Sequence, residues 1–181
     1  VSPGAPTGHV NDFASMLNPA DAAGIEAKLV SLQSSTGVQV AVATVKSLDN
    51  DTVENFAVKL FAEWGIGDKK KDNGLLIVVG RTERKMRIEV GYGLEGTITD
   101  LQSGNIIRNV MTPAFKDGNY ALGISGAVDA VTAIITNSPD AALYSRDNSS
   151  QSDFNFDGGL IAFFLFIGFN VVAILSKSKS W

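Results

Sequence analysis

The sequence predicts an α/β fold, a three-layer α/β/α sandwich with a mixed sheet, plus a C-terminal transmembrane helix. Segments with helical apolar spacing alternate with strand-like segments between about residues 10 and 136. One strand-like run is continuously apolar and the next alternates, which is typical of a buried strand and its hairpin partner. An uncharged apolar stretch from Gly158 to Leu175 follows this region.

The first half of the chain is predicted as helix, strand, helix. Asn18 followed by Pro19 is an N-cap with a proline at the first helical position, and Gly37 ends this helix. A strand rich in valine and alanine follows from Val38 to Val45. A second helix with one apolar face is expected to open at Asp51.

The second half is predicted as a hairpin followed by two helices. The hairpin consists of Leu75 to Val79, a run of the kind buried on both faces, and the alternating segment Lys85 to Val90. Helices are expected from about Asp100 to Met111, ending before Pro113, and from about Tyr120 to Thr136. A strand–helix–strand unit favours a parallel crossover, with the return strand antiparallel beside it.

The composition divides the chain into five segments. We expect a flexible N-terminal segment over residues 1–9, one α/β domain over 10–136, a polar linker over 137–157, a transmembrane helix over 158–175 and a short basic tail over 176–181.

The apolar stretch is long enough to span a membrane. At ~1.5 Å rise per residue it measures ~27 Å, close to the ~30 Å hydrocarbon core of a bilayer. Lys177 and Lys179 follow it, so the positive-inside rule predicts a cytoplasmic C-terminus and an extracytoplasmic domain in the periplasm, a lumen or at the cell surface. The alternative is a buried C-terminal helix. Val1 fits removal of a signal peptide or a start within a longer protein.

Composition also restricts the chemistry. The chain has no cysteine, which excludes disulfides, thiolate zinc sites and cysteine nucleophiles, and its formal charge of −4 without a basic patch argues against a nucleic-acid partner. The only histidine, His9, falls in the predicted flexible segment, where a solvated side chain is expected rather than a member of a triad. Catalysis would therefore depend on carboxylates, most plausibly holding Ca²⁺ or Mg²⁺.

The segment Gly91 to Gly96 matches the dinucleotide fingerprint G-x-G-x-x-G and follows a strand. The fingerprint requires its glycines to open a helix and a further strand to end in an acidic residue. Here Thr97 to Thr99 intervene before the helix, and no such strand follows. We therefore expect no nucleotide at this loop.

Two further motifs are weak. Asp49-Asn50-Asp51 resembles the nucleophile motif of aspartyl phosphatases, but the predicted strand ends at Val45 and Asp51 has a sufficient role as a helix N-cap. Asp153 to Gly158 resembles the first half of an EF-hand loop, but Phe164 stands where the loop requires a bidentate glutamate.

A carboxylate cluster is predicted at one end of the sheet. Asp72 precedes the first hairpin strand and should face Gly91 to Glu95, which follow the second, with Asp100 a few residues on. Gly91 and Gly93 would let the backbone approach a bound ion. The structural alternative is that Asp72 forms a turn, Asp100 caps a helix and Glu95 is a solvated charge.

Several motifs, in order, resemble those of the TPM domain family. They are Asp12, Thr36 to Val40, Trp64 to Gly67, Asp72 to Ile77, Arg87 to Gly96, Asp100 and Phe115 to Tyr120. The resemblance implies an α/β/α sandwich, often exported and tethered by a membrane helix. Some plant members are described as thylakoid acid phosphatases involved in photosystem II repair, and divalent-cation binding has been reported in the family.

Carried onto this chain, the resemblance implies a metal site made by Asp12, Asp72, Glu95 and Asp100. We expect a divalent-cation-binding accessory or assembly subunit of an integral-membrane protein complex, with the membrane as a partner and without nucleic acid or nucleotide. The alternative is a metal-assisted acid phosphatase that uses the same carboxylates. The first reading is favoured because only Lys69 to Lys71 offer positive charge near the cluster. No catalytic residue is assigned.

Overall fold

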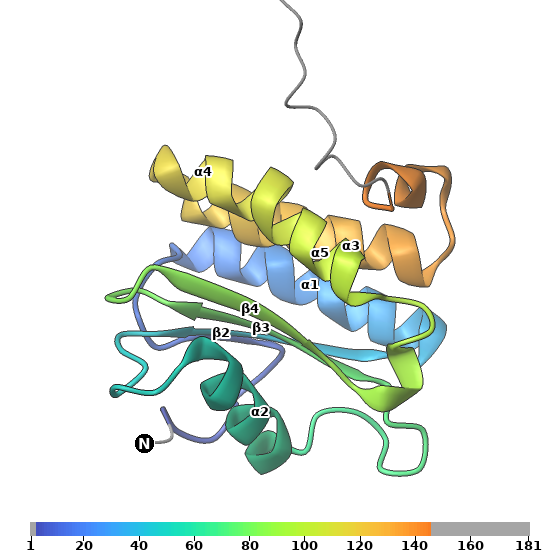
Figure 1. The fold of residues 1–181 in the computed structure, drawn as a ribbon, viewed down its shortest axis with the longest axis horizontal. Coiled ribbons are helices and arrows are strands. Elements are labelled where there is room, and N and C mark those ends of the chain that lie inside the picture. The colour runs from blue at the N-terminus through green and yellow to red at the C-terminus, as the bar shows by residue number, and fades with distance from the viewer. Residues whose placement is uncertain (1–2, 146–181) are drawn as a thin grey trace, which may run out of the picture. The chain divides into compact units, whose positions relative to one another are not determined.

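The computed structural model describes residues 3–145, which form a four-stranded sheet with helices on both faces (Figure 1). The strands are β1 (Val10–Asp12), β2 (Gln39–Val45), β3 (Gly74–Gly80) and β4 (Lys85–Val90), in that order across the sheet. Strands β1, β2 and β3 are parallel, and β4 runs antiparallel to β3. The α/β class and the mixed sheet are thereby confirmed.

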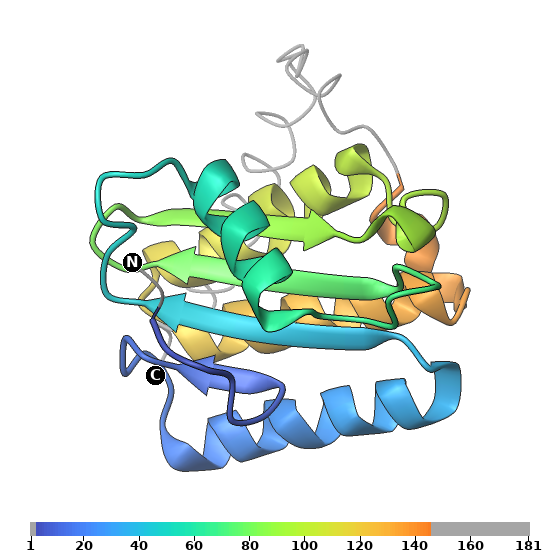
Figure 2. The ribbon, with the colours of Figure 1, turned by 90° about the horizontal axis from the view of Figure 1, so that it is seen from below.

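The helices form unequal layers. They are α1 (Pro19–Thr36), α2 (Val53–Trp64), α3 (Asp100–Ile106), α4 (Thr112–Lys116) and α5 (Tyr120–Ile135), with a π-helical turn η2 (Ile107–Met111) and 3-10 turns η1 (Tyr92–Leu94) and η3 (Pro139–Leu143). Helix α2 lies alone across one face, whereas α1, α3 and α5 cover the other (Figures 1 and 2).

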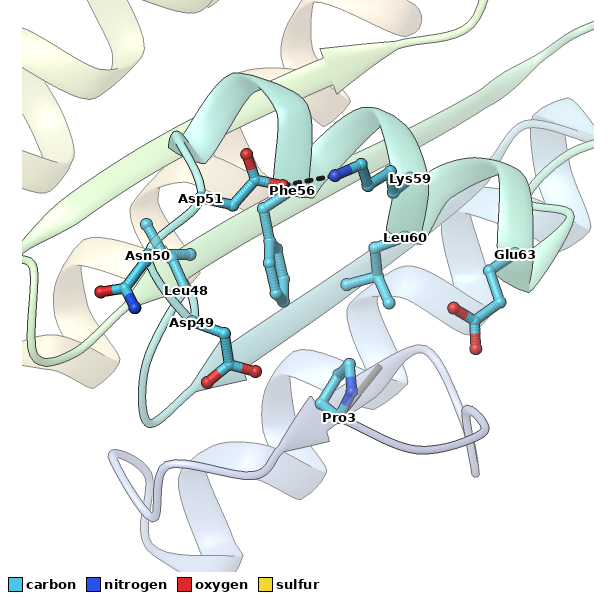
Figure 3. A pocket seen from close by; sticks show the side chains of 9 residues that line it. All are labelled: Pro3, Leu48, Asp49, Asn50, Asp51, Phe56, Lys59, Leu60 and Glu63. Carbon is cyan, nitrogen blue, oxygen red and sulfur yellow. Dashed lines mark hydrogen bonds and ion pairs between the residues drawn. The ribbon is translucent and has the colours of Figure 1, made fainter. Parts of the chain in front are cut away.

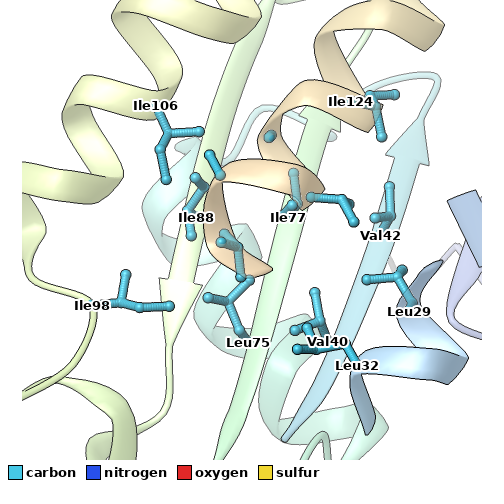
Figure 4. Packing of buried hydrophobic residues seen from close by; sticks show 14 of the residues in the cluster. Leu29, Leu32, Val40, Val42, Leu75, Ile77, Ile88, Ile98, Ile106 and Ile124 are labelled. Atoms are coloured by element: carbon cyan, nitrogen blue, oxygen red, sulfur yellow. The ribbon is translucent and has the colours of Figure 1, made fainter. Parts of the chain in front are cut away.

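The core divides by the two-residue period of the strands. One set of side chains packs beneath α1, α3 and α5, including Val40, Val42, Leu75, Ile77 and Ile88 (Figure 4). The intervening residues pack beneath α2, including Ala41, Ala43, Leu76 and Val78. Every residue of β3 is buried. This explains why the sequence of β3 is continuously apolar rather than alternating.

The predicted start of the first helix is confirmed, and that of the second is wrong by one residue. Asn18 caps α1 by accepting a hydrogen bond from the Asp21 amide at 2.8 Å. Thr52, not Asp51, caps α2. Asp51 instead forms an ion pair with Lys59 at 2.7 Å.

Strand β1 was not predicted, because three residues carry no measurable periodicity. It is held by pairing to β2 and by Glu26 of α1, whose carboxylate accepts hydrogen bonds from the amides of His9 (3.0 Å) and Val10 (2.7 Å). The ring of His9 is half-buried, with Nδ1 2.8 Å from the carbonyl oxygen of Val40. His9 is therefore not the solvated tail residue that the sequence predicted.

The sequence predicted that the helix would end before Pro113, but the helical path continues to Lys116. The π-helical turn η2 widens the spiral, and the Thr112 hydroxyl donates to the Ile107 carbonyl oxygen at 2.8 Å. Pro113 then lies in the first turn of α4, directly after the π-helical turn.

The folded region continues past residue 136. Turn η3 brings Ala141 and Tyr144 against the core, and the buried Asn105 side chain donates to the Tyr144 carbonyl oxygen at 2.9 Å. Within residues 3–145, no helix combines the length and apolar character needed to cross a bilayer. The predicted transmembrane helix over 158–175, the rest of the linker and the tail over 176–181 lie outside the described residues.

We expect a chain ending at residue 145 to be more stable than one ending at residue 136. The shorter chain loses the Tyr144 acceptor of Asn105 and uncovers apolar surface, at a cost of about 2 kcal/mol or more in unfolding free energy. Urea unfolding of the two chains measures the difference. Equal midpoints would show that η3 contributes nothing to the domain.

Candidate functional site

The first candidate site is the end of the sheet where β3 begins and β4 ends. The loop 66–73 precedes β3 there, and the loop 91–96 follows β4 (Figure 1). Asn73 organises the first loop: its side chain accepts from the Asp68 amide at 2.9 Å and donates to the Gly37 carbonyl oxygen at 2.9 Å. We call this region the glycine-loop end.

The two loops touch through their backbones. The Gly91 amide donates to the Gly74 carbonyl oxygen at 2.8 Å, and the Gly93 amide donates to that of Asp72 at 3.1 Å. A Cβ at Gly93 would lie 1.8 Å from the Lys71 carbonyl oxygen, and one at Gly91 would lie 2.3 Å from that of Asp72. These two glycines are therefore required for close packing of backbone on backbone, without any phosphate.

The structure brings three of the four predicted metal ligands to this end. Asp72, Glu95 and Asp100 are all exposed. Within residues 3–145, none of the three has an ion pair or a side-chain hydrogen bond. Asp100 is the first residue of α3, whose N-cap is Thr99. In the same part of the chain, no group of three or more acidic or histidine side chains is arranged to hold a metal ion.

Asp12, the fourth predicted ligand, lies at the opposite end of the sheet. It ends β1 and pairs with Thr44, which in turn pairs with Val79 near the end of β3. At ~3.3 Å per residue, the length of β3 places Asp12 about 20 Å from Asp72. Its carboxylate accepts hydrogen bonds from the amides of Met16 and Leu17, each at 2.9 Å, and from the Thr44 hydroxyl. Asp12 therefore holds the turn after β1 and does not join the other three carboxylates.

The phosphatase-like motif lies in a different cavity, of about 390 Å³ (Figure 3). Asp49 and Asn50 occupy a left-handed turn, with φ of 53° and 64°, four residues after β2 ends. The Lys59 ammonium lowers the pKa of Asp51 through its hydrogen bond to the carboxylate. Because Asp49 is not at a strand tip and Asp51 is paired, this arrangement does not reproduce the nucleophile geometry of that motif.

A further set of side chains was missed by sequence reasoning. Arg81, Arg84 and Lys116 line a cavity of about 520 Å³ at the end of β3 opposite the glycine-loop end. Lys116 is separated from the arginines by more than thirty residues of sequence. Only the packing of α4 beside the β3–β4 turn brings them together, so no local sequence motif predicts the cluster.

Comparison with known proteins gives one family. The model of the TPM domain matches residues 10–134, most of the described chain. The chain belongs to the TPM domain family. A comparison with curated protein sequences finds no match.

Three solved structures are similar to this domain. The N-terminal domain of a protein from P. gingivalis is 40% identical with a TM-score of 0.66, over 76% of this chain and 85% of that one. The N-terminal domain of cg2496 from Corynebacterium glutamicum is 19% identical (TM-score 0.57, 82% and 88%). BA42 from Bizionia argentinensis is 18% identical (TM-score 0.60, 68% and 84%). The last two likenesses concern the fold alone.

We expect Gly93→Ala to destabilise this TPM domain by about 3 kcal/mol, because the added methyl group must displace the backbone at Lys71. Gly96→Ala is the matched control in the same loop, since a Cβ there meets nothing within 4 Å. Thermal unfolding compares the two. A Gly93→Ala variant as stable as Gly96→Ala would mean that the two loops do not pack as described.

Glu83 in the β3–β4 turn should make the stability of the domain depend on pH. Glu83 accepts hydrogen bonds from the Ser47 hydroxyl (2.7 Å) and the Leu48 amide (3.0 Å), and the Ser47 bond lowers the pKa of Glu83. A carboxyl whose pKa is lower when folded stabilises the protein above its unfolded pKa of about 4.3, and this stabilisation is lost as pH falls through the folded value.

Glu83→Gln and Ser47→Ala should therefore both flatten the loss of stability on acidification from about pH 5 downward. Urea unfolding at a series of pH values measures the slope for the parent and the two variants. Slopes identical to that of the parent would show that this carboxylate takes no part in acid unfolding.

Proposed function

We propose that this TPM domain is a membrane-anchored, extracytoplasmic accessory or assembly module that binds a divalent cation, Ca²⁺ or Mg²⁺, at its glycine-loop end. The observation that carries the proposal is the gathering of Asp72, Glu95 and Asp100 at one end of the sheet, all exposed and without a cationic partner in the described region. Unpaired carboxylates are the ligands that hard cations prefer.

The ligand set would be open and partly made of water. No three acidic side chains are arranged to hold a metal ion in residues 3–145, so fewer than three of these carboxylates would contact one ion directly, with backbone carbonyls and waters completing the shell. Such a site predicts weak affinity, of the millimolar kind found in extracellular modules. Lys69, Lys70 and Lys71, which are exposed in the turn before Asp72, lower the affinity further.

The membrane anchor in this proposal rests on the sequence. The uncharged stretch over 158–175 is long enough to span a bilayer, and Lys177 and Lys179 favour a cytoplasmic C-terminus. An anchored domain without an assigned nucleophile or base is better suited to docking on a membrane complex than to chemistry.

The alternative, a metal-assisted acid phosphatase, fits the positions of the charges less well. Such an enzyme needs its metal ion, its attacking water and the phosphate within a few ångströms. The unpaired carboxylates lie at the start of β3, whereas Arg81 and Arg84 follow its end, about 20 Å away. The arginines are thus too distant to hold a phosphate against a metal at the glycine-loop end.

The test is a Ca²⁺ titration of the full chain and of its Asp72→Asn/Asp100→Asn variant, in which binding is measured as the rise in melting temperature. We expect the double variant to bind Ca²⁺ at least about tenfold more weakly, a loss of about 1.4 kcal/mol, with little change in stability without the ion. Both side chains are exposed, so the substitutions should leave the fold intact.

Two controls make the titration specific. Asp140→Asn removes an exposed carboxylate from η3 and should leave the affinity unchanged. Asp12→Asn should lower stability without changing the affinity, because Asp12 lies at the other end. If the double variant binds as tightly as the parent, Asp72 and Asp100 take no part in cation binding and the proposed site is wrong. Phosphate-ester hydrolysis that is lost in the double variant together with Ca²⁺ would support the enzyme instead.

A further inference from the structure

The cavity of about 520 Å³ lies where β3 ends, opposite the glycine-loop end. The β3–β4 turn forms one side, and α4 with the start of α5 forms the other, at the same end of the sheet (Figure 1). This volume is within the range of small-molecule sites. In open α/β sheets, ligands bind preferentially beyond the carboxyl ends of the parallel strands, which is where this cavity lies.

The lining is strongly cationic. Arg81, Arg84 and Lys116 all line the cavity, and no acidic residue does. Within residues 3–145, Arg84 and Lys116 have no ion pair and no side-chain hydrogen bond. Three positive side chains around one hollow repel each other unless an anion lies among them.

Two of these cations are placed by the backbone. The Arg81 amide donates to the Val45 carbonyl oxygen at 2.9 Å, and its Nη1 donates to the Ala14 carbonyl oxygen at 2.9 Å, which leaves other guanidinium N–H groups for a ligand. Arg84 has a φ of 54°, in the tight turn that leads into β4. This positive φ is unfavourable for arginine relative to glycine or asparagine.

None of the nearby carboxylates lines the cavity. Glu83, between the two arginines, accepts from Ser47 and Leu48 on the α2 side of the sheet. Asp12 accepts from the amides of Met16 and Leu17. Asp117 is adjacent to Lys116 but is exposed and does not line the cavity. The positive charge of the cavity is therefore left without a counter-charge from these residues.

The remaining wall is apolar and aromatic. Met16, Met86 and Phe115 line it, and the Phe115 ring packs edge-to-face on Tyr120, with centroids 5.2 Å apart. A wall of this kind binds a hydrocarbon or aromatic group by removing it from water. The cavity therefore offers one cationic side and one apolar side.

We propose that this cavity binds a small organic oxyanion, with its phosphate-like group on Arg81, Arg84 and Lys116 and its apolar body against Met16, Met86 and Phe115. Guanidinium groups match the geometry of oxyanions, and the ammonium of Lys116 adds a point charge. The site is separate from the cation site proposed above and does not depend on it.

The experiment is a calorimetric titration of the full chain with phenylphosphonate. This probe has an oxyanion group and an apolar ring, and it has no ester bond to hydrolyse. We expect saturable binding that weakens at least tenfold in Arg84→Gln/Lys116→Gln, whose parent side chains are exposed and unpaired. Lys69→Gln/Lys70→Gln removes the same charge at the glycine-loop end and should bind like the parent. Inorganic phosphate should bind more weakly than phenylphosphonate, because it lacks the apolar body.

The outcomes separate the explanations. Equal weakening of phenylphosphonate binding in both double variants would show that only the overall charge of the protein matters. Inorganic phosphate that binds as tightly as phenylphosphonate would show that the apolar wall contributes nothing. Either result, or the absence of saturable binding, overturns the proposal. Displacement of the probe by phosphatidylglycerol vesicles identifies a lipid headgroup as the source of the anion, whereas retention of the probe identifies a soluble one. The Ca²⁺ affinity of Arg84→Gln/Lys116→Gln should equal that of the parent.

Discussion

The position of β3 in the sheet keeps charged groups out of the centre of this domain. It pairs in parallel with β2 along its whole length and antiparallel with β4, and all of its residues are buried. A strand buried on both faces cannot carry polar chemistry within its length, because a buried charge without a partner is costly. Charged groups that β3 positions are therefore confined to the loops at its two ends.

Those two ends differ in charge. Before β3, Asp72 lies beside the loop that carries Glu95, and the backbones are held together by the glycine contacts at Gly91 and Gly93. After β3, the chain places Arg81 and Arg84 in a turn whose one carboxylate, Glu83, is already bonded to Ser47 and Leu48. The glycine-loop end thus carries charges of both signs, with Lys69 to Lys71 in the same loop as Asp72, whereas the cavity after β3 is lined by cationic side chains and by no acidic one.

Much of the fold could be predicted because it depends on local signals. The N-cap at Asn18, the continuous apolar run of β3 and the alternation of β4 each report their own element, and the parallel crossover follows from their order. Strand β1 was missed because its pairing to β2, rather than its three residues, makes it a strand. The continuation through Pro113 was missed because the π-helical turn that accommodates it depends on tertiary packing.

The candidate site was only partly predictable, for a related reason. Hairpin geometry was sufficient to bring Asp72 near Glu95, since both flank the same pair of strands. Placing Asp12 required knowledge of β1, whose parallel direction puts that residue at the far end of the sheet. Prediction of the cationic cavity required the position of α4 in the fold, which no local sequence pattern indicates.

The distance between the carboxylates of the glycine-loop end and the cationic cavity also bears on what kind of protein this is. Two of the three glycines in the G-x-G-x-x-G match are explained by packing: the carbonyl oxygens of Asp72 and Lys71 leave no room for a Cβ at Gly91 and Gly93. A hydrolase that joins a metal ion to a phosphate needs both in contact with one water molecule. The carboxylates of the glycine-loop end and the cations of the cavity lie about 20 Å apart and cannot serve one such reaction, whereas the two proposed sites would allow two different ligands to bind at once. A domain that binds without combining its ligands in a reaction acts as an adaptor, which is the role proposed for the anchored module.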